Sequence, residues 1–115
     1  MCTRNQALEI LQRAYVMCNE ALEKRVQEAY LYGSYARGDF HSESDVDILI
    51  TANVDAQELA EYSCYHLISE VCSELSLEYD VTVSITVKPL DQFQRFRYAL
   101  PYYSNVVNEG IRYTK

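Results

Sequence analysis

The N-terminal part of the chain predicts an amphipathic helix over residues 7–24. Its apolar residues recur every three or four positions, which places them on one face of a helix. They are Leu8, Leu11, Tyr15, Cys18 and Leu22. The next segment, residues 26–32, is short and rich in Val, Leu and Tyr. Because it stops at Gly33, we expect a strand that runs into a turn.

The middle of the chain predicts a brief helix, a polar loop and a second strand. Residues 36–37 can form one helical turn that ends at Gly38, because glycine readily adopts the left-handed conformation at a helix end. A polar loop follows over residues 39–44. Residues 45–51 then alternate between two faces, as in a strand with one packed side. The residues on one of these faces are Asp45, Asp47 and Leu49.

A second long helix and a third strand are predicted next. Asp55 and Glu58 have the spacing of a capping-box-like helix start, and a helical stripe of apolar residues continues to Leu75. Residues 80–87 alternate without error, so we expect a strand that Pro89 ends. The polar residues that share one face of this strand are Asp80, Thr82, Ser84 and Thr86.

The C-terminal segment predicts two further helices. Residues 91–100 look helical, and Pro101 suits the first position of a short helix that Gly110 would cap. Three strands with interleaved helices indicate an α/β (α+β) fold, a small mixed sheet flanked by helices. With 115 residues and 13.3 kDa, the chain is expected to form one domain over residues 1–115.

Composition excludes several classes of protein. No apolar run approaches the ~20 residues that a membrane span needs, and the N-terminus has no signal-peptide core. We therefore expect a cytoplasmic protein that does not enter a membrane. The four cysteines show neither a Cys-x-x-Cys motif nor zinc-finger spacing, so we expect no structural zinc and no disulfide framework.

The net charge of −7 is distributed unevenly. Residues 1–87 hold 5 basic and 15 acidic side chains, a net of −10, whereas residues 88–115 hold 5 basic and 2 acidic ones, a net of +3. Residues 1–87 are acidic enough to repel a polyphosphate backbone, so we expect no strong nucleic-acid binding. The same acidic residues can bind divalent cations if their carboxylates converge. The basic C-terminal segment can face an acidic partner.

Residues 33–47 contain the strongest candidate for chemistry. Gly33 lets the backbone approach a ligand, and Ser34 lies where a strand becomes a helix, a place that suits phosphate. Asp45 and Asp47 leave the same face of a strand, with Cα atoms ~6.6 Å apart. Magnesium prefers one or two carboxylates together with phosphate oxygens. Taken singly, each part has a plainer interpretation: a turn with a helix cap, and a solvated sheet face.

The complete pattern, Gly-Ser, ten residues and Asp-x-Asp, resembles the minimal nucleotidyltransferase family, relatives of the DNA polymerase beta superfamily. The flanking Ala36-Arg37-Gly38 and Ser44-Asp45 also look like this family, and the resemblance covers essentially the whole chain. It implies a polymerase beta-like nucleotidyltransferase fold. It also implies a magnesium-dependent enzyme with two Mg²⁺ ions and ATP or another nucleoside triphosphate as substrate.

The resemblance also assigns roles to individual residues. Such proteins carry a third carboxylate on a neighbouring strand, and the matching residue here is Asp80. The implied catalytic and metal-binding residues are Asp45, Asp47 and Asp80, and the implied nucleotide-binding residues are Gly33, Ser34 and Arg37. Asp80 could instead cap the strand or solvate its edge. Arg37 could instead pair with Asp39, Glu43 or another carboxylate and so hold the loop.

Many minimal nucleotidyltransferases are antitoxins paired with a helical HEPN-type toxin. They look like enzymes that transfer AMP from ATP to a tyrosine of that toxin. The resemblance therefore implies an adenylyltransferase in a toxin–antitoxin system with a HEPN protein as partner. The alternative is a binding module that neutralises its partner by contact. We expect a small-molecule nucleotidyltransferase of the antibiotic-modifying kind less, because such an enzyme needs a second domain beyond the one expected here. Homo-oligomer formation stays open, and the eleven tyrosines suit either the core or a protein interface. We expect His41 to be a solvated loop residue. We expect His66 to be a surface or core residue of a helix outside the site.

Overall fold

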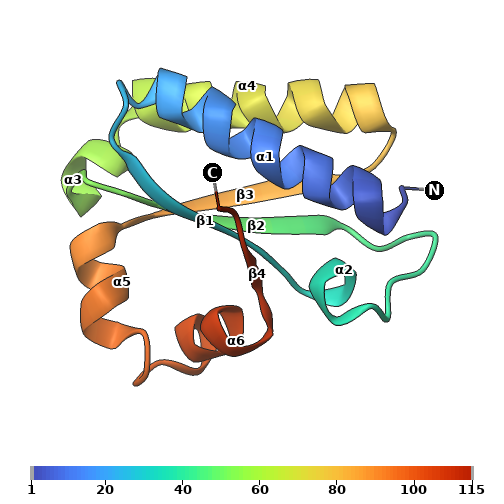
Figure 1. The fold of residues 1–115 in the computed structure, drawn as a ribbon. Coiled ribbons are helices and arrows are strands. Elements are labelled where there is room, and N and C mark those ends of the chain that lie inside the picture. Colours follow the sequence, from blue (N-terminus) through green and yellow to red (C-terminus); the bar gives the residue numbers. More distant parts are fainter. Residues whose placement is uncertain (1, 115) are drawn as a thin grey trace.

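The computed structural model describes residues 2–114 (Figure 1). Helices and strands alternate along most of the chain, as the sequence predicts. In chain order they are α1 (Arg4–Ala21), β1 (Val26–Tyr32), α2 (Ser34–Arg37), β2 (Val46–Ala52), α3 (Ala56–Leu59), α4 (Tyr62–Tyr79), β3 (Val83–Pro89), α5 (Leu90–Phe96), α6 (Pro101–Glu109) and β4 (Ile111–Arg112).

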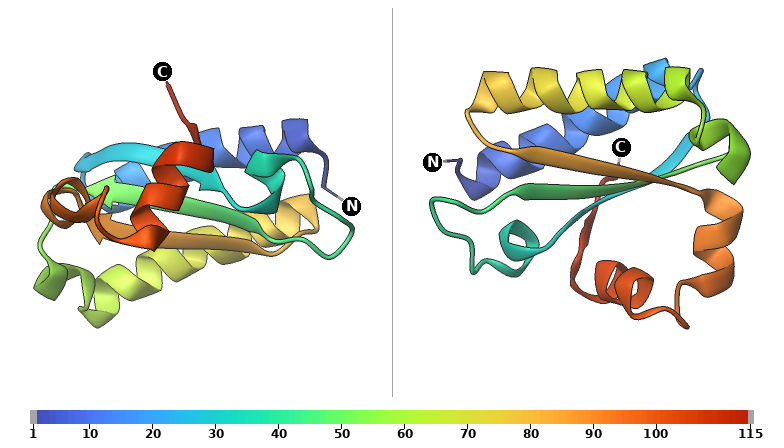
Figure 2. Two further views of the ribbon diagram at one scale, coloured as in Figure 1. Left: turned by 90° about the horizontal axis from the view of Figure 1, so that it is seen from below. Right: turned by 180° about the vertical axis from the view of Figure 1, so that it is seen from behind.

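The strands form one mixed sheet in the order β3-β2-β1-β4. β2 runs parallel to β3, whereas β1 is antiparallel to both β2 and β4. Helices α1 and α4 lie together on one side of the sheet, and α5 and α6 lie on the other (Figures 1 and 2). This arrangement confirms the predicted fold class of a small mixed sheet flanked by helices.

Each face of the sheet has its own apolar cluster, because the strand residues alternate. Ile48 and Ile50 of β2 belong to the larger cluster, beneath α1 and α4. Leu49 points to the other side and packs in a smaller cluster with residues of β1, α5 and α6. The other buried members of that smaller cluster are Tyr30, Phe93, Tyr103 and Val106. The side of β2 that carries Asp47 therefore faces α6, not α1 and α4.

Several local signals act as the sequence predicts. The Asp55 carboxylate accepts a hydrogen bond of 2.7 Å from the backbone N–H of Glu58 at the start of α3. Pro101 is the first residue of α6, and Gly110 follows its last residue. Gly38 ends α2 in the left-handed conformation, with φ of 92°. Short-range rules of capping and chain reversal account for these boundaries.

Other boundaries differ from the prediction. The strand expected over residues 80–87 begins at Val83, because α4 continues to Tyr79 and Asp80 ends it in a left-handed conformation with φ of 51°. The Ser76 side chain on the last turn of α4 accepts the N–H of Val83, which fixes the strand start. The single helix expected after Asp55 is divided into α3 and α4.

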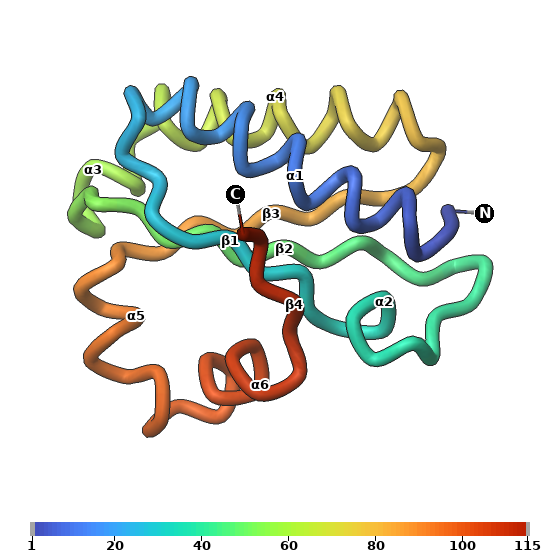
Figure 3. Tube along the Cα trace, in the orientation of Figure 1, coloured from blue at the N-terminus to red at the C-terminus, as the bar shows by residue number. Residues whose placement is uncertain are grey.

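One strand was not predicted from the sequence. β4 has two residues and pairs antiparallel with β1 across Tyr30 and Leu31. The tube in Figure 3 shows the chain returning from α6 to the edge of β1. A two-residue strand has too little length to display alternation, so its pairing depends on where α6 delivers the chain.

Within residues 2–114, all four cysteines are free thiols. Three of them, Cys2, Cys18 and Cys64, are buried and act as small apolar side chains. Within residues 2–114, no helix combines the length and apolar character needed to cross a membrane.

The register of α4 can be tested with two leucines of the same helix. Leu75 is fully buried, and Leu77 is 85% exposed. We expect Leu75→Ala to lower the free energy of unfolding by about 2–5 kcal/mol, because it leaves a cavity. Leu77→Ala should change it by no more than about 0.5 kcal/mol. Urea denaturation measures both. Equal losses would show that α4 is rotated about its axis relative to this structure.

Candidate active site

The site is organised around the chain reversal at Gly33, between β1 and α2. Gly33 has φ of 78° and ψ of −155°, a conformation open almost only to glycine. A Cβ atom built there would lie 2.8 Å from Oδ2 of Asp47. The Asp47 carboxylate therefore lies directly against the backbone of the bend. This is the close approach that the sequence predicts for Gly33, although here the approaching group belongs to the protein itself.

The single turn of α2 is fixed by contacts of Tyr35 and Arg4 with the rest of the fold. Tyr35 is almost fully buried, and its hydroxyl donates a hydrogen bond of 3.1 Å to the carbonyl oxygen of Cys2. Its ring stacks on Phe40 at a centroid distance of 4.4 Å. The Arg4 guanidinium donates to the carbonyl oxygen of Ala36 at 3.3 Å. These contacts tie the bend to the start of α1 and fix the position of Ser34, which is half-buried at the first position of α2.

Asp47 lies on the side of the sheet that faces α6, whereas Asp45 precedes the first residue of β2, Val46, and so lies outside the strand that was predicted over residues 45–51. Asp47 pairs in register with Tyr32 on β1 and with Ser84 on β3. Its carboxyl is half-buried, and burial is the main cause that raises its pKa above the usual range. The negative charge of Asp45 raises the pKa further, whereas the nearby Arg37 lowers it. The two carboxylates are thus close enough to repel each other.

Arg37 is bound by carboxylates of its own chain. Its Nε lies 3.3 Å from Oδ2 of Asp39, and its Nη1 lies 3.5 Å from Oε2 of Glu109. The pairing with Asp39 is the alternative that the sequence left open. All three side chains are well exposed, and such pairs contribute little to stability. Arg37 and Glu109 also line a pocket of about 230 Å³ next to Gly33.

Asp80 lies apart from the bend. It lines a different pocket of about 270 Å³, together with Asp45 and the 42–44 loop. Within residues 2–114, no three His, Cys, Asp or Glu side chains are grouped in a way that could hold a metal ion. The structure thus brings Asp47 against Gly33, and it places Asp45 close enough to Asp47 to affect its pKa and beside the pocket that Asp80 lines. The role predicted for Asp80 stays a prediction, without the strand position on which it depended.

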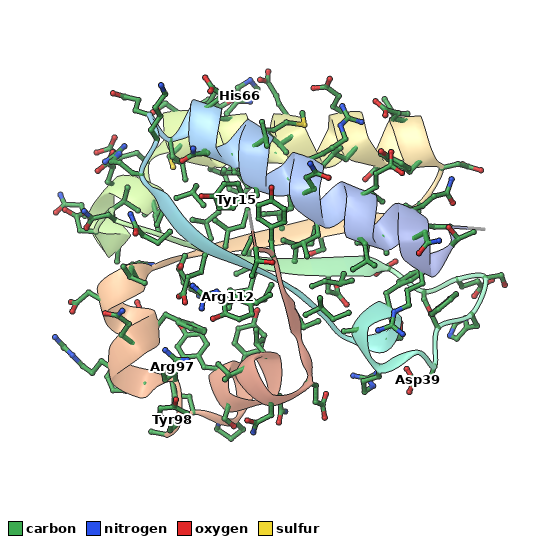
Figure 4. The ribbon with its side chains drawn as sticks, viewed as in Figure 1. Tyr15, Asp39, His66, Arg97, Tyr98 and Arg112 are labelled. Atoms are coloured by element: carbon green, nitrogen blue, oxygen red, sulfur yellow. The ribbon has the colours of Figure 1, made fainter. Side chains whose placement is uncertain are left out.

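Both histidines take part in local contacts. The Nδ1 of His41 accepts the N–H of Glu43 at 3.2 Å within the polar loop. His66 lies on the outer side of α4, across the molecule from Asp39 (Figure 4), and pairs with Glu70 at 3.1 Å. His66 therefore lies outside the candidate site, as predicted.

Two tyrosines at the site were not predicted from the sequence. The Tyr32 hydroxyl lies 3.0 Å from that of Tyr102, which comes from α6. Burial, the Tyr102 hydroxyl and the charge of Asp47 together raise the pKa of Tyr32, so its hydroxyl stays protonated. The one signal in the sequence is the position of Tyr32 directly before Gly33, and its place beside Asp47 comes from the strand register. Tyr102 is distant along the chain and carries no local signal.

Comparison with protein families gives a match over most of the chain. The family model described as "Nucleotidyltransferase domain" matches residues 16–112. A "putative protein adenylyltransferase" of Methanocaldococcus jannaschii is 34% identical over 86 residues, which cover 75% of this chain and 76% of that protein.

Two solved structures resemble this fold. A "putative nucleotidyltransferase" from Sulfolobus solfataricus gives a TM-score of 0.56 at 20% identity, covering 96% of this chain and 85% of that one. A chain in a crystal structure described as a toxin-antitoxin with AMP-PNP gives 0.52 at 22% identity, covering 95% and 70%. At such low identity, both structures support the fold alone.

The contact between Gly33 and Asp47 predicts the effect of adding a methyl group. Gly33→Ala should lower the free energy of unfolding by about 1–3 kcal/mol, because alanine avoids this backbone conformation. The contact between the added Cβ atom and the Asp47 carboxylate should lower it further. Gly38→Ala is the control, since its φ is also positive and a Cβ atom added there would meet no other atom within 4 Å.

A double-mutant cycle separates the contact from the backbone cost. In an Asp47→Ala background, Gly33→Ala should cost less, by a coupling energy within about 0.5–3 kcal/mol. The cost of Gly38→Ala should be the same in both backgrounds. Urea denaturation measures all four differences. Zero coupling between Gly33 and Asp47 would mean that the carboxylate does not lie against the bend.

The raised pKa of Asp47 predicts how stability depends on pH. The folded chain holds the carboxyl proton more tightly than the unfolded chain, whose ordinary value is 3.8. The ionised carboxylate therefore destabilises the fold as pH rises above that value. We expect Asp47→Asn to unfold at higher temperature than wild type at pH 7 without divalent cations, and the difference to shrink toward pH 3.8. A lower melting temperature for the variant at pH 7 would contradict this assignment.

Proposed function

This chain belongs to the nucleotidyltransferase domain family, and we propose that it transfers AMP from ATP to a hydroxyl group of a protein. The observation that carries the proposal is the placement of Asp47 against the Gly33 bend, with Asp45 close enough for its charge to raise the pKa of Asp47. This arrangement brings two carboxylates and an exposed turn of backbone to one place, as binding of a cation-bound triphosphate requires.

The donor set suits magnesium. Asp45 and Asp47 supply carboxylate oxygens, and the repulsion between them, which raises the pKa of Asp47, is relieved by a cation. These two residues would hold Mg²⁺, which prefers one or two carboxylates with phosphate oxygens. When bound, the ion neutralises phosphate charge and stabilises the charge that develops during transfer.

The chain's own residues bind and orient the nucleotide. Gly33 presents a backbone without a side chain, and the Ser34 hydroxyl, next along the chain, can donate to a phosphate oxygen. Arg37 exchanges its weak pairs with Asp39 and Glu109 for the phosphates, which are stronger partners. The acceptor oxygen bonds to the α-phosphorus, the bond from phosphorus to the bridging oxygen breaks, pyrophosphate leaves, and the acceptor proton passes to water.

We propose a protein tyrosine as the acceptor, on a helical HEPN-type toxin for which this chain is the antitoxin. Support comes from the relative described as a protein adenylyltransferase and from the similar fold in a toxin-antitoxin structure.

A second candidate is neutralisation of the partner by contact alone. The observation that favours it is the exposed aromatic surface of α4, where Tyr62 is 79% and Tyr65 is 69% exposed. Exposed tyrosines are typical of protein interfaces. This candidate needs no turnover, so variants of the carboxylates distinguish the two.

Transfer is tested with labelled ATP, Mg²⁺ and the protein product of the gene next to this chain's gene. We expect label on that protein and a loss on the order of 100-fold or more in Asp45→Asn and in Asp47→Asn, since each removes a carboxylate that offsets phosphate charge. Asp91→Asn is the control, because Asp91 is exposed and only pairs with Arg95 on α5. Neutralisation that survives both substitutions, with no label transferred, would support the contact mechanism instead.

A further inference from the structure

We propose that the site holds one divalent cation, not two, because Ser84 stands beside Asp47 on the neighbouring strand where a second cation would need a carboxylate. This inference rests on the proposed function, because it concerns the cation at Asp45 and Asp47. It follows from the register of β2 against β3, which the sequence alone could not provide. Two cations about 3.5–4 Å apart serve phosphoryl transfer in many enzymes. Each of the two must find its own set of oxygen ligands.

A second cation needs a further carboxylate beside Asp47. The positions next to Asp47 on the same face are its register partners on the neighbouring strands. They are Tyr32 on β1 and Ser84 on β3. Tyr32 is a phenol whose hydroxyl lies 3.0 Å from that of Tyr102, so it supplies no carboxylate. Ser84 is an exposed hydroxyl, which adds no negative charge. Neither register partner of Asp47 can therefore offset the charge of a second cation.

Other residues on this face of the sheet do not supply the missing charge. The next position on β3, Thr86, is again a hydroxyl residue and pairs with Leu49. Glu28 of β1 pairs with Thr51, four residues from Asp47 and so ~13 Å along the strand. Its oxygens accept from Tyr30 and Thr51. The Glu28 carboxylate is thus hydrogen-bonded far from Asp47, toward the other end of the strand.

Asp80 lies outside β3 and so does not stand in register beside Asp47. It precedes Val83, the first residue of β3, by three positions and is the left-handed end of α4. Asp80 shares the 270 Å³ pocket with Asp45, whereas Gly33 lines the separate 230 Å³ pocket. Glu109 of α6 lines the pocket at Gly33, but its Oε2 atom pairs with Nη1 of Arg37 at 3.5 Å.

Substitution at Ser84 should complete the site. In Ser84→Asp, a carboxylate stands beside Asp47 on the adjacent strand, where neighbouring side chains share one face. Three carboxylates together repel, so the variant should be less stable than wild type without cations and should gain more in melting temperature when Mn²⁺ is added. Ser84→Asn is the matched control, since it has nearly the same shape and no charge.

The test is the number of Mn²⁺ ions bound per chain, measured by equilibrium dialysis with saturating AMP-PNP. We expect one ion for wild type, Ser84→Asn and Asp80→Asn, and two ions for Ser84→Asp. Two ions for wild type, or loss of an ion in Asp80→Asn, would overturn the inference and leave the proposed function standing. AMP-PNP bound with no ion, or no AMP-PNP bound at all, would overturn both. The wild-type count decides the question even if Ser84→Asp does not fold.

Discussion

The site depends on one contact, between the carboxylate of Asp47 and the bare backbone of Gly33. The contact is available only because residue 33 lacks a side chain and adopts a conformation that other residues avoid. It holds a half-buried carboxylate beside Asp45, at a cost that comes first from burial of the charge and then from repulsion by Asp45. A cation bound between phosphates and carboxylates removes that cost, so the unliganded fold is prepared for it.

The rest of the fold keeps this contact rigid. β2 is flanked on both sides by other strands, and its two faces are covered by separate apolar clusters. Asp47 therefore stands on a strand that cannot shift without exposing core residues. The bend itself is tied to the N-terminal end of α1 through Tyr35 and Arg4. α6 completes the surroundings by placing Tyr102 and Glu109 opposite the bend.

Features set by neighbouring residues could be predicted from the sequence, and features set by register could not. The alternation of residues 46–51 specifies the face of β2 that carries Asp47, and the bend at Gly33 follows from its residue type. The alternation that begins at Asp80 looked like a strand, but α4 continues through Tyr79 because Leu75 is part of its buried face. Only the pairing of β2 with β3 shows that Ser84 stands beside Asp47. The link from Arg37 to Glu109 likewise depends on the path of α6.

The most direct measurement is a crystal structure of this chain soaked with Mg²⁺ and AMP-PNP. The account predicts a magnesium ion bound by the carboxylates of Asp45 and Asp47, with the phosphates against Gly33 and Ser34. A nucleotide bound elsewhere on the molecule, with Asp47 still packed against Gly33 and free of metal, would contradict it.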